Sequence, residues 1–259
     1  MANFRTHIGI GTIATGFLAT ITMAAAVVTP NQVMSLALAG ALGSVLPDID
    51  LQRSRSSRAI FFVLALFFSF CALFSYGWKY SILEMWLIWL AVFLGVRYIG
   101  QALFHRFAVH RGVFHSILAG VFFMFAATVI CYHILDVSAE LSWLAGFFVL
   151  FGYIVHLLLD EIYSVDFDNT RIKRSFGSAF KLYEYKSIGA SLAMLVAAIL
   201  AFYIAPSSEA FIKSVSSEDM WLFVWQKLLP DNGLFGWQDQ LQKMIAFFYE
   251  NSSDIEPNL

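Results

Sequence analysis

The sequence predicts an all-α membrane protein, a polytopic bundle of about seven membrane segments. Its 259 residues are 59% hydrophobic and only 13% charged, whereas an ordinary soluble domain carries about 25% charged residues. The mean hydropathy is +0.72. Several apolar windows also reach the roughly 20 residues that a helix needs to cross a bilayer. This composition excludes an ordinary soluble globular domain.

Seven apolar runs follow one another along the chain. The first begins just after His7, and an alternative interpretation is a cleaved signal peptide with "AAA" at 24–26 as its cleavage site. The second is short, rich in Gly and Ala, and ends in "LPDID". Small residues let helices approach closely in lipid, so we expect this helix inside the bundle. The runs cover about residues 8–28, 33–46, 59–77, 82–104, 114–135, 141–160 and 187–205.

The chain divides into a transmembrane domain, residues 1–206, and a tail, residues 207–259. The tail mixes apolar and polar residues at roughly helical spacing and contains Trp221, Trp225 and Trp237. Tryptophan favours the headgroup region, so we expect an interfacial helix pair that breaks at "PDNG". A small docked subdomain without lipid contact is the alternative.

Basic residues predict the orientation of the bundle. They follow the second, fourth and sixth runs, whereas the other connections hold one lysine between them. The positive-inside rule places the three basic connections and the N-terminus in the cytoplasm, and the tail outside. The basic residues are Arg53, Arg55, Arg58, Arg106, Arg111, Arg171, Lys173, Arg174, Lys181 and Lys186.

This topology gathers histidines and aspartates from four separate stretches at the cytoplasmic end of the bundle. His156 and Asp160 are four residues apart, on one face of a helix. Imidazole and carboxylate groups together are the usual ligands of zinc, manganese or iron. Each group alone also has an ordinary structural explanation, and His105 is ambiguous. The sequence predicts a metal site from the conjunction of His7, Asp48, Asp50, His110, His115, His156 and Asp160.

The order of a starting histidine, "LPDID", "HRGVFHS" and "HLLLD" in a polytopic chain resembles the YdjM-type family. The resemblance covers residues 1 to about 160, with Phe114 at a position where the family usually has threonine. It implies an inner-membrane, metal-dependent hydrolase that is distantly similar to zinc-dependent phospholipase C. It also implies the seven residues just named as candidate ligands.

Seven candidates exceed one tetrahedral zinc site and would suit two ions that share Asp48 or Asp50 as a bridge. We therefore expect a divalent metal, zinc or manganese, in one or two copies. Arg111 is suited to a two-point contact with phosphate, although it could equally be a cytoplasmic anchor. Asp50 and Arg111 are the candidate catalytic residues. Gly112 would allow a tight turn, and Ser116 is expected to cap the fifth helix.

A metal site at the bilayer face favours an amphiphilic substrate. The first hypothesis is a hydrolase of a phospholipid or another lipid-linked phosphoester. The alternatives are a metal-ion transporter or channel and a membrane scaffold with a structural metal. Transporter sites usually lie at the membrane midplane, which disfavours the transporter. Membrane lipids are the expected partners, the basic loop 171–186 could bind anionic headgroups or a protein, and no nucleic acid is expected.

Overall fold

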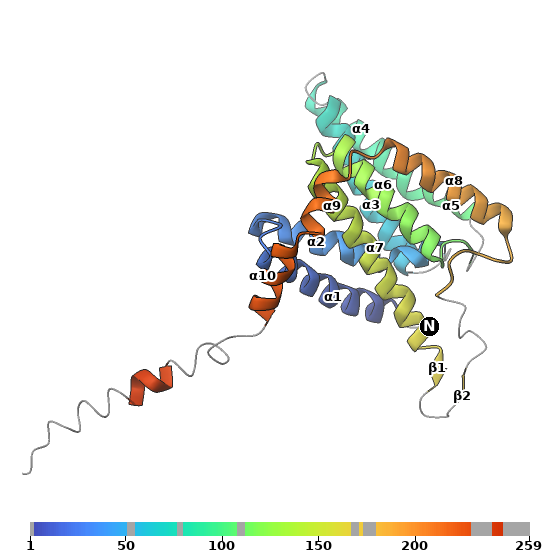
Figure 1. The fold of residues 1–259 in the computed structure, drawn as a ribbon. Helices are drawn as coiled ribbons and strands as arrows, with labels where there is room; N and C mark the ends of the chain where they lie inside the picture. Colours follow the sequence, from blue (N-terminus) through green and yellow to red (C-terminus); the bar gives the residue numbers. More distant parts are fainter. Residues whose placement is uncertain are drawn as a thin grey trace, which may run out of the picture.

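The computed structural model describes residues 3–50, 55–76, 80–107, 112–166, 171–172, 180–228 and 240–245. It is a bundle of helices (Figure 1), which confirms the predicted all-α class. One pair of two-residue strands, Val165–Asp166 and Arg171–Ile172, is antiparallel. The helical elements are α1 (Phe4–Ala24), α2 (Pro30–Gly43), η1 (Leu46–Asp50), α3 (Arg55–Tyr76), α4 (Ile82–Leu94), the π-turn η3 (Gly95–Gly100), α5 (Gln101–Phe107), α6 (Ile117–His133), α7 (Ala139–Ile162), α8 (Ile188–Ile204), α9 (Glu209–Val215) and α10 (Glu218–Leu228).

Four helical segments of the described chain are long and apolar enough to cross a membrane, and up to five if a bent pair counts as one span. The prediction of seven spans is therefore not confirmed. Each apolar run does contain a helix, but α2 has 14 residues and α6 has 17. At 1.5 Å per residue these rise about 21 and 26 Å, less than the roughly 30 Å of the hydrocarbon core. The four segments are Phe4–Ala24, Ser56–Leu73, Ile82–Arg106 and Ala139–Ile162.

Helix α8 is followed by a sharp change of direction. The axis turns by 95° between Ile188–Ile204 and Glu209–Trp225, and α9 and α10 then run along one side of the bundle, where they contact α7 and α1 (Figure 1). Large apolar side chains remain exposed on this segment, among them Trp221 and Trp225. The helical character expected for the start of the tail is present, whereas the "PDNG" break lies outside the described residues. The interfacial position of the tail stays a prediction.

Helix α7 is the centre of the bundle and packs against α1, α2, α6 and α9. Glycines make the closest of these approaches. A Cβ atom on Gly152 of α7 would overlap the carbonyl oxygen of Gly40 in α2, and one on Gly43 would overlap Val149. Contacts of this kind between backbones explain how the short, Gly-rich α2 packs closely against α7. The prediction that α2 lies inside the bundle holds for one face only, because Met34, Leu38 and Leu42 are exposed on the other.

Replacement of Gly152 by alanine should destabilise the bundle strongly. The added methyl group meets backbone on α2, so the two helices must separate, which costs about 3 kcal/mol, at the upper end of overpacking effects. Gly16→Ala is the matched control, because a Cβ atom there has no neighbour within 4 Å. Melting of the purified proteins in detergent measures the difference. Equal melting temperatures for both variants would contradict this account of the packing.

The start of α6 is fixed from two sides. The Ser116 hydroxyl accepts a hydrogen bond from the Ala119 N–H at 3.3 Å, which confirms the predicted cap. The next N–H groups, of Ile117 and Leu118, donate to the carbonyls of Lys181 and Leu182. The segment 180–187 therefore holds the position of His115, which directly precedes the cap.

A buried carboxylate shapes the segment 180–187 itself. Burial raises the pKa of the Glu184 carboxyl, but hydrogen bonds from the Lys181 ammonium and the Lys186 N–H lower it by more. The net effect is a lowered pKa. Glu184 thus stays ionised and paired with Lys181, and the segment keeps its shape at neutral pH.

Candidate metal centre

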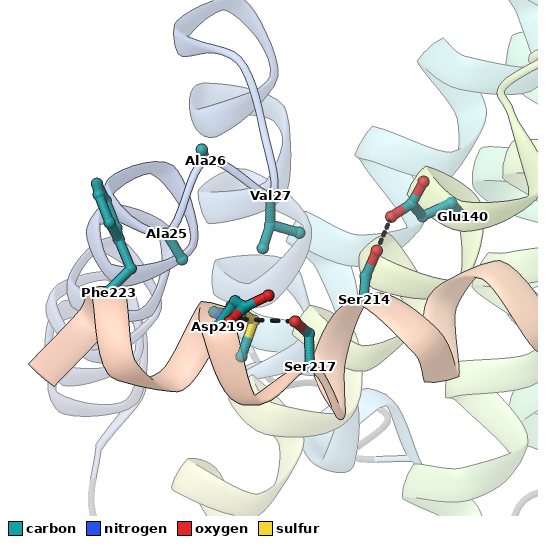
Figure 2. A pocket seen from close by; sticks show the side chains of 9 residues that line it. Ala25, Ala26, Val27, Glu140, Ser214, Ser217, Asp219 and Phe223 are labelled. Atoms are coloured by element: carbon teal, nitrogen blue, oxygen red, sulfur yellow. Dashed lines mark hydrogen bonds between the residues drawn. The ribbon is translucent and has the colours of Figure 1, made fainter.

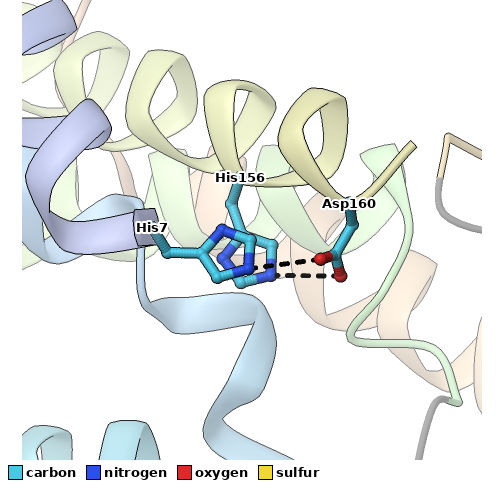
Figure 3. A group of neighbouring side chains, drawn as sticks. All are labelled: His7, His156 and Asp160. Atoms are coloured by element: carbon cyan, nitrogen blue, oxygen red, sulfur yellow. Dashed lines mark ion pairs between the residues drawn. The ribbon is translucent and has the colours of Figure 1, made fainter. Parts of the chain in front are cut away.

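Five buried side chains meet at one end of the bundle. His7 comes from the first turn of α1, Asp48 from η1, and His115 from the turn before α6. His156 and Asp160 come from the last two turns of α7. Their exposed fractions range from 0% for His156 to 8% for Asp48. Figure 3 shows three of them, with the carboxylate of Asp160 facing both imidazoles. Four of the predicted stretches thus converge, as the sequence indicates.

Two imidazole nitrogens and two carboxylate oxygens alternate in a ring of four neighbouring atoms. The Nε2 atom of His156 lies 3.7 Å from Oδ2 of Asp160 and 3.8 Å from Oδ1 of Asp48. The Nε2 atom of His115 lies 3.7 Å from the same oxygen of Asp48 and 3.8 Å from the same oxygen of Asp160. These separations are too long for hydrogen bonds. Two ligands of one tetrahedral zinc, each about 2.0–2.1 Å from the metal, would lie roughly 3.3 Å apart.

The spacing therefore suits a shared cation better than direct contact. Two overlapping groups, His7–His156–Asp160 and Asp48–His115–His156, each offer three ligand atoms within 4.8 Å of one another. Imidazole and carboxylate are the donors that zinc and manganese take. These buried groups could hold a metal ion.

The protonation of His156 is fixed by the backbone. Its Nδ1 atom lies 2.7 Å from the carbonyl oxygen of Ser44. A carbonyl only accepts, so Nδ1 carries the proton and the lone pair of a neutral ring is on Nε2. Nε2 is buried and has no hydrogen-bond partner among the described residues. A backbone carbonyl behind an imidazole is the usual support for a metal-ligating histidine.

The two carboxylates are oriented differently. The Ser56 hydroxyl of α3 donates to Oδ2 of Asp48 at 3.1 Å, which leaves Oδ1 toward the two imidazoles. Asp160 directs Oδ2 to His115 and His156, and Oδ1 to Nε2 of His7 at 3.2 Å. The ring of His7 stacks on that of His156, with centroids 3.7 Å apart. Among the described side chains, Asp160 has the geometry of a bridge, the role that the sequence assigns to Asp48 or Asp50.

The turn that carries His115 is tied to α7. The Tyr153 hydroxyl donates to the carbonyl oxygen of Phe114, the residue before His115. Tyr153 is itself fully buried and lies one turn before His156 on the same helix. Helix α7 therefore supplies two ligand candidates and also positions a third.

The remaining sequence-predicted site residues are outside the described side chains. His110 and Arg111 lie outside the described residues, and so does the side chain of Asp50, whose backbone belongs to η1. His105 contacts Ser57 rather than the cluster. His133 bonds the Ile204 carbonyl at the other end of α6 and is not part of the cluster. Sequence reasoning missed Ser44, Ser56 and Tyr153, because supporting serines and tyrosines carry no spacing signal.

A cavity of about 540 Å³ lies at the opposite end of α1 from His7. Figure 2 shows it between the turn after α1 and the segment α9–α10, with Glu140 and Asp219 at its rim. Ser214 donates a hydrogen bond to Glu140 there. None of the metal-centre residues lines this cavity, so the two features are separate.

Removal of the Ser56 hydroxyl should weaken metal binding without unfolding the protein. Ser56→Ala frees Asp48 to rotate, and loss of such a supporting hydrogen bond typically costs about 10–100-fold in metal affinity. Ser69→Ala is the control, since Ser69 is also buried on α3 but donates to its own helix, at Ala65. Titration of the metal-stripped proteins with zinc gives both affinities. Equal affinities would remove Asp48 from the ligand set.

One comparison with known proteins finds a family. The family model described as YdjM inner membrane protein matches residues 1–209, which contain all five clustered side chains. No curated protein and no solved structure matches the chain. The matched part covers α1 to α8 and includes every one of the four spans. The chain is a membrane protein that belongs to the YdjM inner membrane protein family.

Proposed function

We propose that this protein is a membrane-embedded, metal-dependent hydrolase of a phospholipid or another lipid-linked phosphoester. The observation that carries the proposal is the alternating set of His115, Asp48, His156 and Asp160, with nitrogen-to-oxygen separations of 3.7–3.8 Å at one end of an apolar bundle. Ionisable groups at such depth are costly and are retained for a function.

The proposed ligands of a first ion are His115, His156, Asp48 and Asp160. His7 would either orient Asp160 through Oδ1 or, with His156 and Asp160, hold a second ion. Zinc and manganese are the proposed metals. A bound ion of this kind lowers the pKa of a water and polarises a phosphoryl oxygen.

The chain's own residues would keep the centre ready for this chemistry. The Ser44 carbonyl holds the Nδ1 proton of His156, so that Nε2 faces the cluster. The Ser56 hydroxyl restrains Asp48. Arg111, in the connection just before His115, is proposed to hold the phosphate by a two-point contact. Asp50 remains a candidate for proton transfer.

The location of the centre supports a lipid substrate. The centre lies at one end of the bundle, where a headgroup could approach while its acyl chains stay in the membrane. We place this end on the cytoplasmic side of the inner membrane, on the strength of the basic connections around it. A transporter would need its ion site near the midplane, and the position of the cluster at the helix ends favours the enzyme.

The test combines elemental analysis with turnover. The purified protein should contain zinc or manganese, and should release a metal-dependent product from a phospholipid extract. Tyr153→Phe tests the supporting contact to Phe114 and should lower turnover while metal stays bound. Metal uptake into vesicles without any product would overturn the hydrolase and support the transporter. Bound metal without product or uptake would support the structural scaffold.

A further inference from the structure

A stripe of polar side chains follows one face of the segment α4–η3–α5. Arg97, Gln101 and His105 are spaced four residues apart. Arg97 donates a hydrogen bond to the Gln101 side-chain oxygen. The Ser57 hydroxyl of α3 lies 2.9 Å from Nε2 of His105 and 3.5 Å from the Gln101 amide nitrogen. The stripe is unexpected, because this segment is one of the four spans.

Arg97 brings a positive charge into that span without a matching carboxylate. Among the described residues it forms no ion pair, and its contacts are the neutral Gln101 and the ring of Tyr98, 5.5 Å away. An arginine is charged at any pH that a cell reaches. A charge at membrane depth normally has a partner, so Arg97 calls for an anion from outside the described chain.

The position of Arg97 sets which anion can reach it. It precedes Arg106, at the end of the span, by nine residues, or about 14 Å of helix rise. Its side chain is directed toward Gln101, four residues closer to that end. The guanidinium is therefore only about 8 Å below the level of Arg106. A phosphate of the nearer leaflet is within reach if its headgroup moves a few ångströms inward.

Beside Arg97, part of the η3 surface is uncovered in the described part of the chain, whereas the stripe itself contacts α3 through Ser57. A Cβ atom on Gly95 would meet nothing within 4 Å, and one on Gly100 would meet only the Gly95 carbonyl, at 3.6 Å. Tyr98 and Ile99 are 62% and 71% exposed. The π-turn between the two glycines is a helix irregularity that is frequent at functional sites. If the segment Ile82–Arg106 crosses the bilayer, as its length and composition indicate, a ligand of this uncovered surface would arrive from the lipid.

We infer that Arg97, positioned by Gln101, binds the phosphate group of a membrane lipid. The planar guanidinium offers parallel N–H donors that match two phosphate oxygens. The stripe continues through Ser57 to the adjacent Ser56, which holds Asp48 of the metal centre. A lipid held here would lie beside that centre. Its role as a substrate rests on the proposed function, whereas the binding itself does not.

The test measures lipid binding to metal-free protein in a maltoside detergent, which contains no phosphate. Added phosphatidylglycerol should raise the melting temperature of the wild type and appear as a bound lipid in native mass spectra. Arg97→Gln should weaken this binding about tenfold or more. Arg97→Lys should bind with intermediate affinity, because it keeps the positive charge but loses the two parallel N–H donors of the guanidinium. Arg106→Gln, a change at the end of the same span, should bind like the wild type.

Two further ligands identify the recognised group. Diacylglycerol, which has the same tails without phosphate, should show no Arg97-dependent binding. Wild-type affinity in Arg97→Gln would overturn the inference, and equal stabilisation by inorganic phosphate would show a free anion in place of a lipid. Chelation of metal leaves this assay unchanged, so failure of the hydrolase proposal would not affect it. If Arg97 binds a lipid and the protein is also a lipid hydrolase, Arg97→Gln should raise the KM for a lipid substrate.

Discussion

His156→Ala is expected to abolish metal binding and turnover together. His156 belongs to both groups of three candidate ligands, so its loss affects one ion or two. Even an outer-shell partner contributes about 10–100-fold to metal affinity, so removal of a central ligand should exceed 100-fold. Elemental analysis after purification and turnover with added zinc would measure both effects.

The matched control for this variant is His133→Ala. His133 bonds the Ile204 carbonyl at the far end of α6 and contributes nothing to the cluster. The His133→Ala variant should keep the metal content of the wild type. A loss of metal in His156→Ala then cannot come from the removal of an imidazole as such. Wild-type metal content in His156→Ala would reduce the cluster to a buried set of polar contacts.

Asp160→Asn should remove the stabilisation that metal confers on the protein. A ligand at 100 times its dissociation constant stabilises the folded state by about 2.7 kcal/mol. A variant with about 100-fold weaker binding would gain only about 0.4 kcal/mol under the same conditions. The change is nearly isosteric, yet it removes the charge that faces His7, His115 and His156. Melting curves with and without zinc give the two values.

Asp219→Asn serves as the control for a lost carboxylate. Asp219 lines the cavity at the opposite end of the bundle and should leave the zinc-dependent shift unchanged. If Asp160→Asn retained the full shift, the bridge assigned to its two oxygens would be wrong, and His115 with Asp48 would be the better centre for a single ion.

Composition was enough to predict the fold class but not the number of spans. Long apolar runs with few charges have few structural solutions other than membrane helices. Where a run ends in three dimensions depends on turns and close contacts. Helix α2 ends at Gly43, and the chain then passes through a turn into η1. That turn lies against the backbone of α7, a contact that no apolar pattern in the sequence indicates.

The candidate site was predictable as far as residue type reveals chemistry. His156 and Asp160 could be paired from their spacing, and Asp48 and His115 from their place at run ends. The Ser44 carbonyl could not be found this way, because every residue has one. The stacking of His7 on His156 accompanies a close approach of α1 to Ser44, at Gly11, and the carbonyl of Ser44 holds His156. The distance between two helices depends on tertiary packing, which the spacing of residues along the sequence does not reveal.

The stacked pair of His7 and His156 has a consequence for biosynthesis. One ring belongs to α1 and the other to α7, and α1 is synthesised before α7. At about 5–20 residues per second, the roughly 150 residues between them take on the order of 10–30 s to be made. Throughout that interval α1 is in the membrane without the helix that completes its histidine's surroundings. An ion that needs His156 and Asp160 could therefore bind only after α7 has been made, and a chain truncated before residue 156 would lack the histidine common to both groups of candidate ligands.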